Sequence, residues 1–200
     1  MTFGTPQEKR IIVDMVHRAH ASVKGAGYSA DEAHLQLWVA ATLYAVAVSM
    51  YEDIFGSMEP VAAEVLYQEY AIFAVSLRVP AEMWPADRRD IWAYWNQHIE
   101  SLEVTPEAKH VAYDLLYNAR LPLLVAMLMP LIRLITVEML PPRIRRAYGF
   151  ESTVLQRMTY RIVLEMTRAI YPLIPTYIRT IPMRYYLKDM RKRIRRIDRQ

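Results

Sequence analysis

The sequence predicts an all-α fold, a single multi-helix domain of about seven or eight helices, and three observations support this prediction. Apolar residues recur at helical spacing through nearly every segment of the 200-residue chain. Glycine is rare, with 5 residues, whereas proline reaches 12 and stands mostly near the ends of apolar segments. No stretch alternates apolar and polar residues over the length of a strand between turn signals.

The first helix is expected to begin at Thr5 and Pro6, which supply an N-cap and a first-turn proline. Its apolar face carries residues at i, i+3 and i+4 spacing, namely Ile12, Val13, Val16, His17, His20 and Val23. The glycines at 25 and 27 end this helix. The next helix is expected to start at Ser29, because Glu32 completes a capping box with it.

The remaining elements follow from the same kind of signals. Helices are predicted over residues 29–56, 60–76, 85–102, 105–116, 151–171 and 182–196. Thr105, Pro106 and Glu107 place a cap, a proline and an acidic residue in the order that opens a helix. No internal repeat and no linker interrupts this succession, so one domain is expected.

The most apolar stretch, residues 121–140, allows two interpretations. It is either a buried pair of helices broken by proline or a membrane span. Pro122, Pro130, Arg133 and Glu138 all lie within these 20 residues. Charges and helix-breaking prolines favour the buried pair, which ends at the two prolines that follow Leu140.

The formal net charge is +4, but it is distributed unevenly. Eight basic and two acidic residues lie between Arg184 and Arg199, so this segment carries +6 and the rest of the chain −2. We therefore divide the chain into a domain over 1–182 and a basic C-terminal helical tail over 183–200. The tail is either a solvated helix or an attachment to an anionic membrane surface, with its apolar side at Leu187, Met190, Ile194 and Ile197.

Composition excludes several classes of function. The chain has no cysteine, which rules out a disulfide framework, a thiolate metal site and a cysteine nucleophile. It has no phosphate-binding loop and no dinucleotide fingerprint. A nucleic-acid partner is not expected, because the positive charge is confined to the tail. No secretory signal is visible at the N-terminus, so a cytoplasmic location is expected, with peripheral membrane attachment through the tail as an addition.

Two patterns of histidine could carry metal chemistry. His17 and His20 lie three residues apart on the apolar face of the first helix, where a neutral imidazole is either a haem ligand or a buried side chain bonded to a backbone carbonyl. Glu107 and His110 match half of a di-iron motif. No second half is present, which favours Glu107 as an acidic residue that stabilises a helix N-terminus.

An ordered series of short sequence motifs allows a more specific prediction of the protein family. It consists of VHRAHASVKG (16–25), YSAD (28–31), LWV (37–39), YQEY (67–70), VP (79–80), WP (84–85), LPPRIR (140–145) and YG (148–149). This series resembles the family of catalytic domains shared by MpaB-type oxygenases and latex clearing protein, a rubber oxygenase. The resemblance covers the chain from about residue 5 to residue 182.

The resemblance implies an all-helical domain that holds haem b and cleaves double bonds of isoprenoid chains with dioxygen. The family's histidine in the H-x-x-V-x-G helix supplies the proximal iron ligand, and this match assigns His20 to that role. His17 stands at the position of a second family histidine, which would orient the haem or form a hydrogen bond at its edge. Arg18 or Lys24 would pair with a haem propionate, and the substrate is expected to be a hydrophobic, isoprenoid-like molecule.

The pocket for this substrate is expected on the helix that follows. It would be lined by Trp38, Val39, Thr42 and Leu43, if that helix faces the first across the glycine-containing turn. The competing interpretation of these four residues is ordinary core packing.

The chain departs from the family pattern in two places. Relatives carry an Arg-Leu-x-x-Thr-like segment roughly thirty residues before the ligand histidine, whereas 19 residues precede His20 here. Ala40 stands where relatives often have a histidine after the Trp-Val pair. We expect an N-terminally short member or fragment with a differently built distal pocket. The alternative function is a non-catalytic helical module that binds haem or lipid, associated with the membrane through its tail.

Overall fold

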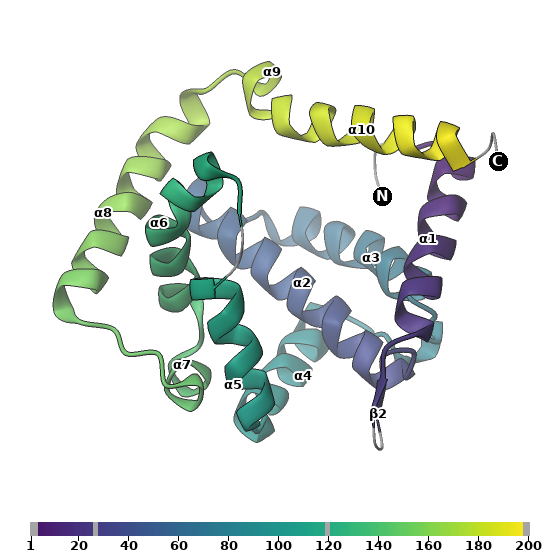
Figure 1. Cartoon of the computed structure of the whole chain (residues 1–200), viewed down its shortest axis with the longest axis horizontal. Helices are drawn as coiled ribbons and strands as arrows, with labels where there is room; N and C mark the ends of the chain where they lie inside the picture. The colour runs from purple at the N-terminus through teal and green to yellow at the C-terminus, as the bar shows by residue number, and fades with distance from the viewer. Residues whose placement is uncertain (1–3, 26–27, 119–120, 198–200) are drawn as a thin grey trace. The chain divides into compact units, whose positions relative to one another are not determined.

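The computed structural model describes residues 4–25, 28–118 and 121–197, and it confirms the all-α class (Figure 1). Ten α-helices lie in these residues, slightly above the predicted number, because Pro142 and Pro175 each precede or open a short additional helix. The α-helices are α1 (Pro6–Ala21), α2 (Ala33–Phe55), α3 (Pro60–Ser76), α4 (Arg88–Ser101), α5 (Pro106–Tyr113), α6 (Leu123–Met139), α7 (Pro142–Tyr148), α8 (Val154–Ile170), α9 (Thr176–Arg179) and α10 (Ile181–Ile197). Short elements are the strands β1 (Lys24–Gly25) and β2 (Tyr28–Ser29), the 3₁₀ turns η1 (Ala81–Met83) and η3 (Tyr171–Leu173), and the π-helical turn η2 (Asp114–Asn118).

The contacts within the chain divide it into two compact units. Unit 1 comprises residues 1–92 and 170–200, and unit 2 comprises residues 93–169. Unit 1 therefore contains α1 to α3 together with α9 and α10, and unit 2 contains α5 to α7 and nearly all of α8. The boundary lies within α4.

Local capping chemistry fixes the start of α1 as expected. The Thr5 hydroxyl accepts a hydrogen bond from the Glu8 amide at 3.2 Å, and the Glu8 carboxylate accepts one from the Thr5 amide at 2.8 Å. The start of α2 differs from the prediction. The Ser29 amide donates to Glu32 at 2.9 Å, as in a capping box, but α2 begins only at Ala33.

The reason for this delay is a short antiparallel strand pair that the periodicity did not predict. Lys24 pairs with Ser29 and Gly25 with Tyr28, so Ser29 has extended backbone rather than helical backbone. Residues 26 and 27, which include one of the glycines expected to end the first helix, lie outside the described residues.

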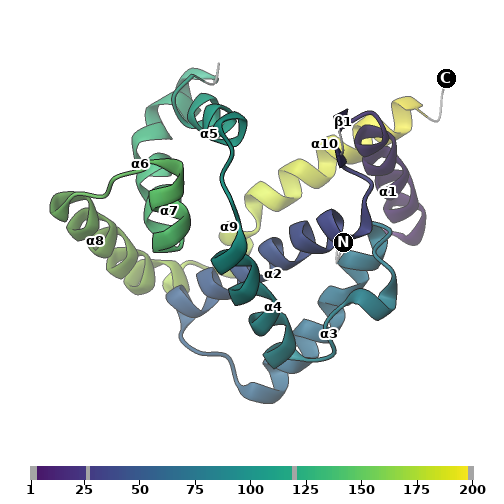
Figure 2. The same ribbon diagram turned by 90° about the horizontal axis from the view of Figure 1, so that it is seen from below.

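The core of unit 1 is aromatic and lies between α2 and α3, which run side by side (Figure 1, Figure 2). The ring of Tyr44 is 5.2 Å from that of Tyr67 and 5.3 Å from that of Tyr70, and Trp84 stacks on Tyr67 at 5.4 Å. Burial raises the pKa of the Tyr67 hydroxyl, which donates a hydrogen bond to the Pro85 carbonyl. These edge-to-face and stacked pairs stabilise the α2–α3 contact beyond their apolar area.

Helix α2 is, within the described residues, the one helix long and apolar enough to cross a membrane by length and composition alone. A core helix meets the same criterion. The buried residues of α2 follow one face, from Gln36 and Leu37 through Tyr44 to Val48, and this face packs in unit 1.

The C-terminus of α3 leaves one carbonyl available to α1. Arg78 adopts a left-handed conformation with φ of 65°, and the amides of Arg78 and Val79 donate to the carbonyls of Val75 and Ala74. This is a Schellman arrangement, which leaves the carbonyl of Ser76 for a partner from outside the helix. That partner is a side chain of α1, described below.

In unit 2, the structure of residues 121–140 differs from the predicted buried pair of helices broken by proline. Pro130 lies inside a continuous helix, α6, rather than between two helices. Only the hydrogen bond from residue 130 to the carbonyl of Ala126 is lost, and Ala126 is exposed, so water can satisfy that carbonyl. The helix is also less buried than expected, since Leu123 and Met127 are largely exposed and Met129 is its buried residue.

The LPPRIR motif explains how unit 2 is tied together. Pro142 opens α7, and the guanidinium of Arg143 donates to the carbonyls of Ile99 and Leu102 at 2.8 and 2.7 Å, which caps the end of α4. Arg145 pairs with Glu138 at 2.9 Å. Glu138 is only 6% exposed, so this ion pair is largely shielded from solvent.

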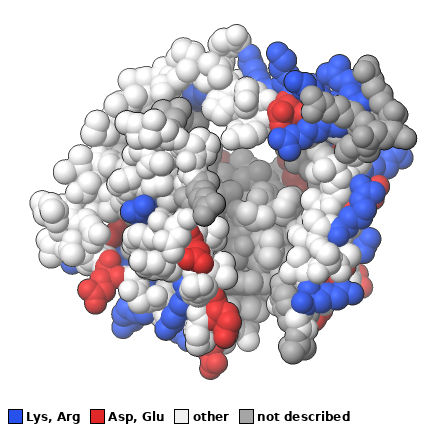
Figure 3. All heavy atoms as spheres, viewed as in Figure 1, with Lys and Arg blue, Asp and Glu red and all other residues white. Residues whose placement is uncertain are grey.

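The basic C-terminal helix α10 packs against α1 within unit 1 (Figure 1, Figure 2). Arg191 and Glu8 form an ion pair at 2.8 Å, and Ile194 is 7% exposed. The apolar side of α10, for which a solvated helix and a membrane attachment were the two interpretations, faces α1 at Ile194 and at the half-buried Leu187 and Met190. Basic side chains gather on the outer surface over α10 and α1 (Figure 3). The side chain of Ile197 is outside the described set.

An apolar groove remains open between these two helices. Its volume is about 690 Å³. Its walls are formed mainly by Ile12, Met15, Val16 and Ala19 of α1 and by Met183, Leu187, Met190 and Ile194 of α10.

Candidate functional site

The two predicted histidines lie on the face of α1 that meets α2 and α3. The Nε2 atom of His17 is 2.9 Å from the carbonyl oxygen of Ser76, so this nitrogen carries a proton and donates to the exposed end of α3. The Nδ1 atom of His20 is 2.8 Å from the Nε2 atom of Gln36 on α2. Both rings are half-buried.

Gln36 determines which ring nitrogen of the neutral His20 imidazole carries the proton. Its side chain is buried, at 3% exposure, and its amide nitrogen also donates to the carbonyl of Ala30. Since a carbonyl can only accept, the amide must keep its NH₂ group towards both Ala30 and His20. The Nδ1 atom of His20 is therefore an acceptor, and the proton of the neutral ring lies on Nε2. The Oε1 atom of Gln36 is buried and has no hydrogen-bond partner in the described part of the chain.

A haem iron bound at His20 would require a different arrangement of the same atoms. His20 would offer its Nε2 lone pair to the iron, and Nδ1–H would then donate to a neighbouring acceptor. Turning the Gln36 amide would bring Oε1 to that position. The turn loses the bond to Ala30, worth about 1 kcal/mol, and sets two carbonyl oxygens against each other unless the Gln36 side chain also moves. The residues thus fit a haem ligand once this amide turns. His17 fits an orienting role and not a ligand role, because its Nε2 is bonded to Ser76.

Two of the four predicted pocket residues lie on the same side of α2 as Gln36. Val39 and Leu43 follow Gln36 by three and seven residues, a spacing that keeps them on one helix face. They are 43% and 44% exposed, and Val46 and Met50 continue this apolar strip. Trp38 and Thr42 are half-buried; Thr42 follows Val39 by three residues and borders this strip, whereas Trp38 lies on the other side of α2 from Gln36.

The predicted propionate partners are both exposed. Arg18 precedes His20 by two residues, which places it about 200° around the helix, on the opposite side of α1. Lys24 lies in β1, just beyond the end of α1. The structure therefore brings His20 into contact with Gln36 and leaves Arg18 on another face of α1, while Val39 and Leu43 follow Gln36 along α2.

The half di-iron motif has no partner in the structure. Across residues 4–25, 28–118 and 121–197, no group of three or more His, Cys, Asp or Glu side chains is placed to hold a metal ion. The pKa of Glu107 is lowered by its backbone hydrogen bond in the first turn of α5, with a contribution from Thr105. His110 lies 3.3 Å from Asp114, one turn further on. These contacts agree with a helix-terminus role for Glu107.

Sequence reasoning missed two features. Gln36 lies on the buried face of α2 together with Leu37 and Ala40, and a single amide on an apolar face was the signal that could have identified it. The second feature is a cavity in unit 2, lined in part by Tyr113 and Tyr117. These tyrosines are one turn apart, but the cavity also depends on helices that meet only in the fold.

Comparisons with known proteins agree with the motif series. A family model described as the ER-bound oxygenase mpaB/B′/rubber oxygenase catalytic domain matches residues 1–169. Uncharacterized proteins of Mycobacterium bovis and Mycobacterium tuberculosis are each 30% identical to the chain over 200 residues, covering 97% of this chain and 78% of theirs. No solved structure matches the chain.

Proposed function

The chain belongs to the family of ER-bound oxygenase mpaB/B′ and rubber oxygenase catalytic domains, and from this premise we propose that it is a haem b-dependent oxygenase acting on hydrophobic, alkene-bearing substrates. One observation carries the proposal. His20 has its Nδ1 atom held by a buried amide, and an open apolar strip begins beside that amide on α2. A metal-binding histidine typically donates from its second ring nitrogen to an acceptor, a role that the Gln36 amide can take when it turns.

The residues of the site would have distinct tasks in this reaction. Haem iron with one protein ligand supplies the activation of dioxygen when it is bound. His20 would hold the iron through Nε2, while Gln36 would accept a hydrogen bond from Nδ1–H and fix the plane of the ring. Val39 and Leu43 would offer an apolar surface to an isoprenoid-like substrate and exclude water from it. Exposed Lys24 is the candidate partner for a haem propionate.

The test is an absorption spectrum of the full-length protein after haem reconstitution. We expect a sharp Soret band in the wild type and its loss in His20→Ala. His34→Ala is the matched control, because His34 is exposed on α2, 3.5 Å from Glu32, and lies outside the site. An intact Soret band in His20→Ala would contradict the assignment of the iron ligand.

Oxygen uptake then separates an enzyme from a binding module. With squalene as an isoprenoid substrate, haem-loaded wild-type protein is expected to consume dioxygen, and His20→Ala is not. Full haem loading without oxygen uptake would support the alternative function, a non-catalytic helical module that binds haem or a hydrophobic ligand.

A second candidate function, attachment to a membrane surface, is favoured by α8. None of its residues is buried, and one side of the helix carries apolar residues that are each more than half exposed: Val154, Leu155, Met158, Ile162, Met166 and Ile170. Arg157, Arg161 and Arg168 lie along one border of this strip. Apolar residues bordered by arginine are typical of helices that lie in the headgroup region. The surface over α8 in Figure 3 is mostly uncharged.

Co-sedimentation with vesicles tests this attachment. We expect binding to phosphatidylserine-containing vesicles that weakens with salt and that is lost in the double variant Ile162→Glu, Met166→Glu. The control replaces Lys188 and Lys192, exposed on α10, with glutamine, and we expect it to retain most of the binding. The reverse result, with loss only in the α10 variant, would return the attachment to the basic tail.

A further inference from the structure

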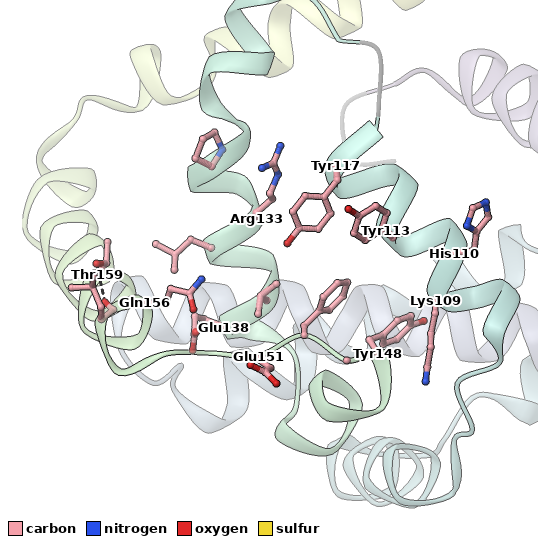
Figure 4. Close-up of a pocket in the computed structure, with 16 residues that line it drawn as sticks. Lys109, His110, Tyr113, Tyr117, Arg133, Glu138, Tyr148, Glu151, Gln156 and Thr159 are labelled. Carbon is pink, nitrogen blue, oxygen red and sulfur yellow. Dashed lines mark hydrogen bonds between the residues drawn. The ribbon is translucent and has the colours of Figure 1, made fainter.

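Unit 2 contains a cavity that none of the residues predicted for the haem or its substrate line, although His110 of the half di-iron motif does. Its volume is about 790 Å³, within the range of sites that hold drug-sized molecules. The walls come from α5, η2, α6, the segment after α7 and the start of α8 (Figure 4). All of these elements lie within residues 93–169, so the cavity belongs to one compact unit.

Arg133 of α6 is a charged group whose orientation at this cavity is fixed by two contacts. Its Nε atom donates to the carbonyl of Leu116 at 2.6 Å, and its guanidinium lies over the ring of Tyr117, 4.6 Å from the centroid. The ring of Tyr117 in turn stacks on Tyr113 at 4.7 Å. Figure 4 shows Arg133 and Tyr117 directed towards each other from opposite walls. Fixed in this way, the guanidinium keeps its two terminal amino groups for other acceptors.

The charge of Arg133 is not neutralised by the nearest acidic residue of its own helix. Glu138 also lines the cavity, but its carboxylate is paired with Arg145 at 2.9 Å and accepts a hydrogen bond from Ser152. Glu151 and Lys109 are exposed at the edge and have opposite charges. Among the described residues that line the cavity, Arg133 is therefore the arginine or lysine held in one orientation, since Lys109 is exposed at the edge.

The remaining walls are apolar or aromatic. Pro130, Leu134 and Val137 of α6 face the cavity, and Phe150 adds a ring from the segment after α7. Two irregularities in the helices shape this space. Tyr117 lies on the π-helical turn η2, and Pro130 interrupts the hydrogen bonding of α6. Turns of the π type are frequent at functional sites.

From these observations we propose that the unit 2 cavity binds a monocarboxylate with an apolar chain, its carboxylate on Arg133 and its chain along Leu134 and Val137. A carboxylate matches the planar edge of a guanidinium and forms charge-assisted hydrogen bonds with it. The apolar walls favour burial of a hydrocarbon chain. This site is separate from His20 and does not depend on haem.

Calorimetric titration of the full-length protein with decanoate tests the proposal. We expect saturable binding of decanoate, and binding at least about tenfold weaker for decanol, which has the same chain without the charge. Arg133→Gln is expected to weaken decanoate binding by about tenfold or more, and Arg133→Lys by less, because lysine keeps the charge but not the planar fork. Arg146→Gln, on the exposed surface of α7 outside the cavity lining, is the matched control and should bind decanoate as the wild type does.

A second variant guards against a loss of structure, because Arg133 also binds the Leu116 carbonyl. Leu134→Trp keeps Arg133 and fills the cavity, so it should abolish decanoate binding while the helical circular dichroism stays unchanged. The proposal is overturned if decanol binds as tightly as decanoate, if Leu134→Trp binds normally, or if the wild type does not bind decanoate.

Discussion

At the scale of single residues, Gln36 decides which ring nitrogen of His20 is available. The contact between the two side chains is 2.8 Å, and the bond from Gln36 to the Ala30 carbonyl holds the amide with its donor towards His20. The ligand-free chain therefore keeps a proton on the nitrogen that iron would use. A ligand at His20 must both displace this proton to Nδ1 and turn the amide.

This dependence gives a prediction for Gln36→Glu. A carboxylate can only accept, so it should shift the proton of His20 to Nδ1 and free Nε2. We expect haem affinity to rise by about tenfold, the low end of the effects known for groups that orient metal ligands. Nitrogen-15 NMR of the haem-free protein reports the tautomer directly. Finding Nδ1–H already in the wild type would contradict the role assigned to Gln36.

The residue scale also shows what sequence could and could not supply. His17 and His20 could be singled out because their spacing and their neighbours Val23 and Gly25 form a motif. Their hydrogen-bond partners, Ser76 and Gln36, are 59 and 16 residues away and carry no local signal of that contact. Which nitrogen is protonated depends on those partners, so it could not be predicted from the motif.

At the scale of elements, helix starts were predictable wherever local chemistry decides them. Thr5 and Thr105 cap α1 and α5 as expected, since an N-cap depends on residues within one turn. The prediction for Pro130 was wrong because the effect of an internal proline depends on whether the freed carbonyl reaches water, which is a property of the fold. The strand pair before α2 was missed for a similar reason, since it spans too few residues to show a period.

The contact between α1 and α10 is predicted to depend on pH. The pKa of Glu8 is lowered, first by its hydrogen bond with Arg191 and then by the amide of Thr5. A lowered pKa in the folded state means that the contribution of this pair is present above the unfolded value of 4.5 and is lost as the pH falls through the folded value.

Urea unfolding between about pH 6 and about pH 3 can measure this contribution. The wild type is expected to be more stable than Glu8→Gln at the upper end, and the difference should vanish at the acidic end. Glu100→Gln, on the exposed surface of α4, is the control and should not show this convergence. A constant difference between wild type and Glu8→Gln would rule out the ion pair as its source.

At the scale of the whole molecule, the all-α class follows from composition and period alone, because few glycines and recurrent apolar faces leave little else for the chain to form. Which helix packs against which apolar face does not follow from composition and period. The apolar side of α10 was visible in the sequence, but its contact with α1 joins residues 183 positions apart, as Glu8 and Arg191 show. Periodicity indicates that one face of a helix is buried, but it does not indicate which other element packs against that face.

The two candidate sites lie in different units. His20 and Gln36 belong to unit 1, and the Arg133 cavity belongs to unit 2. The family match covers both, whereas α9 and α10 lie beyond its end at residue 169. An experiment on one site therefore leaves the other as an internal reference for correct folding.

Helix α1 contacts the candidate haem site with one face and α10 with another. One of its faces carries His17 and His20, and a neighbouring face, with Ile12 and Met15, forms a wall of the groove against α10. A rigid helix cannot shift one face without shifting the other. If His20 binds the proposed haem more tightly in one position of α1 than in another, a displacement of α10 that moves α1 changes that affinity, and thermodynamic linkage requires haem to change the docking of α10 by the same factor.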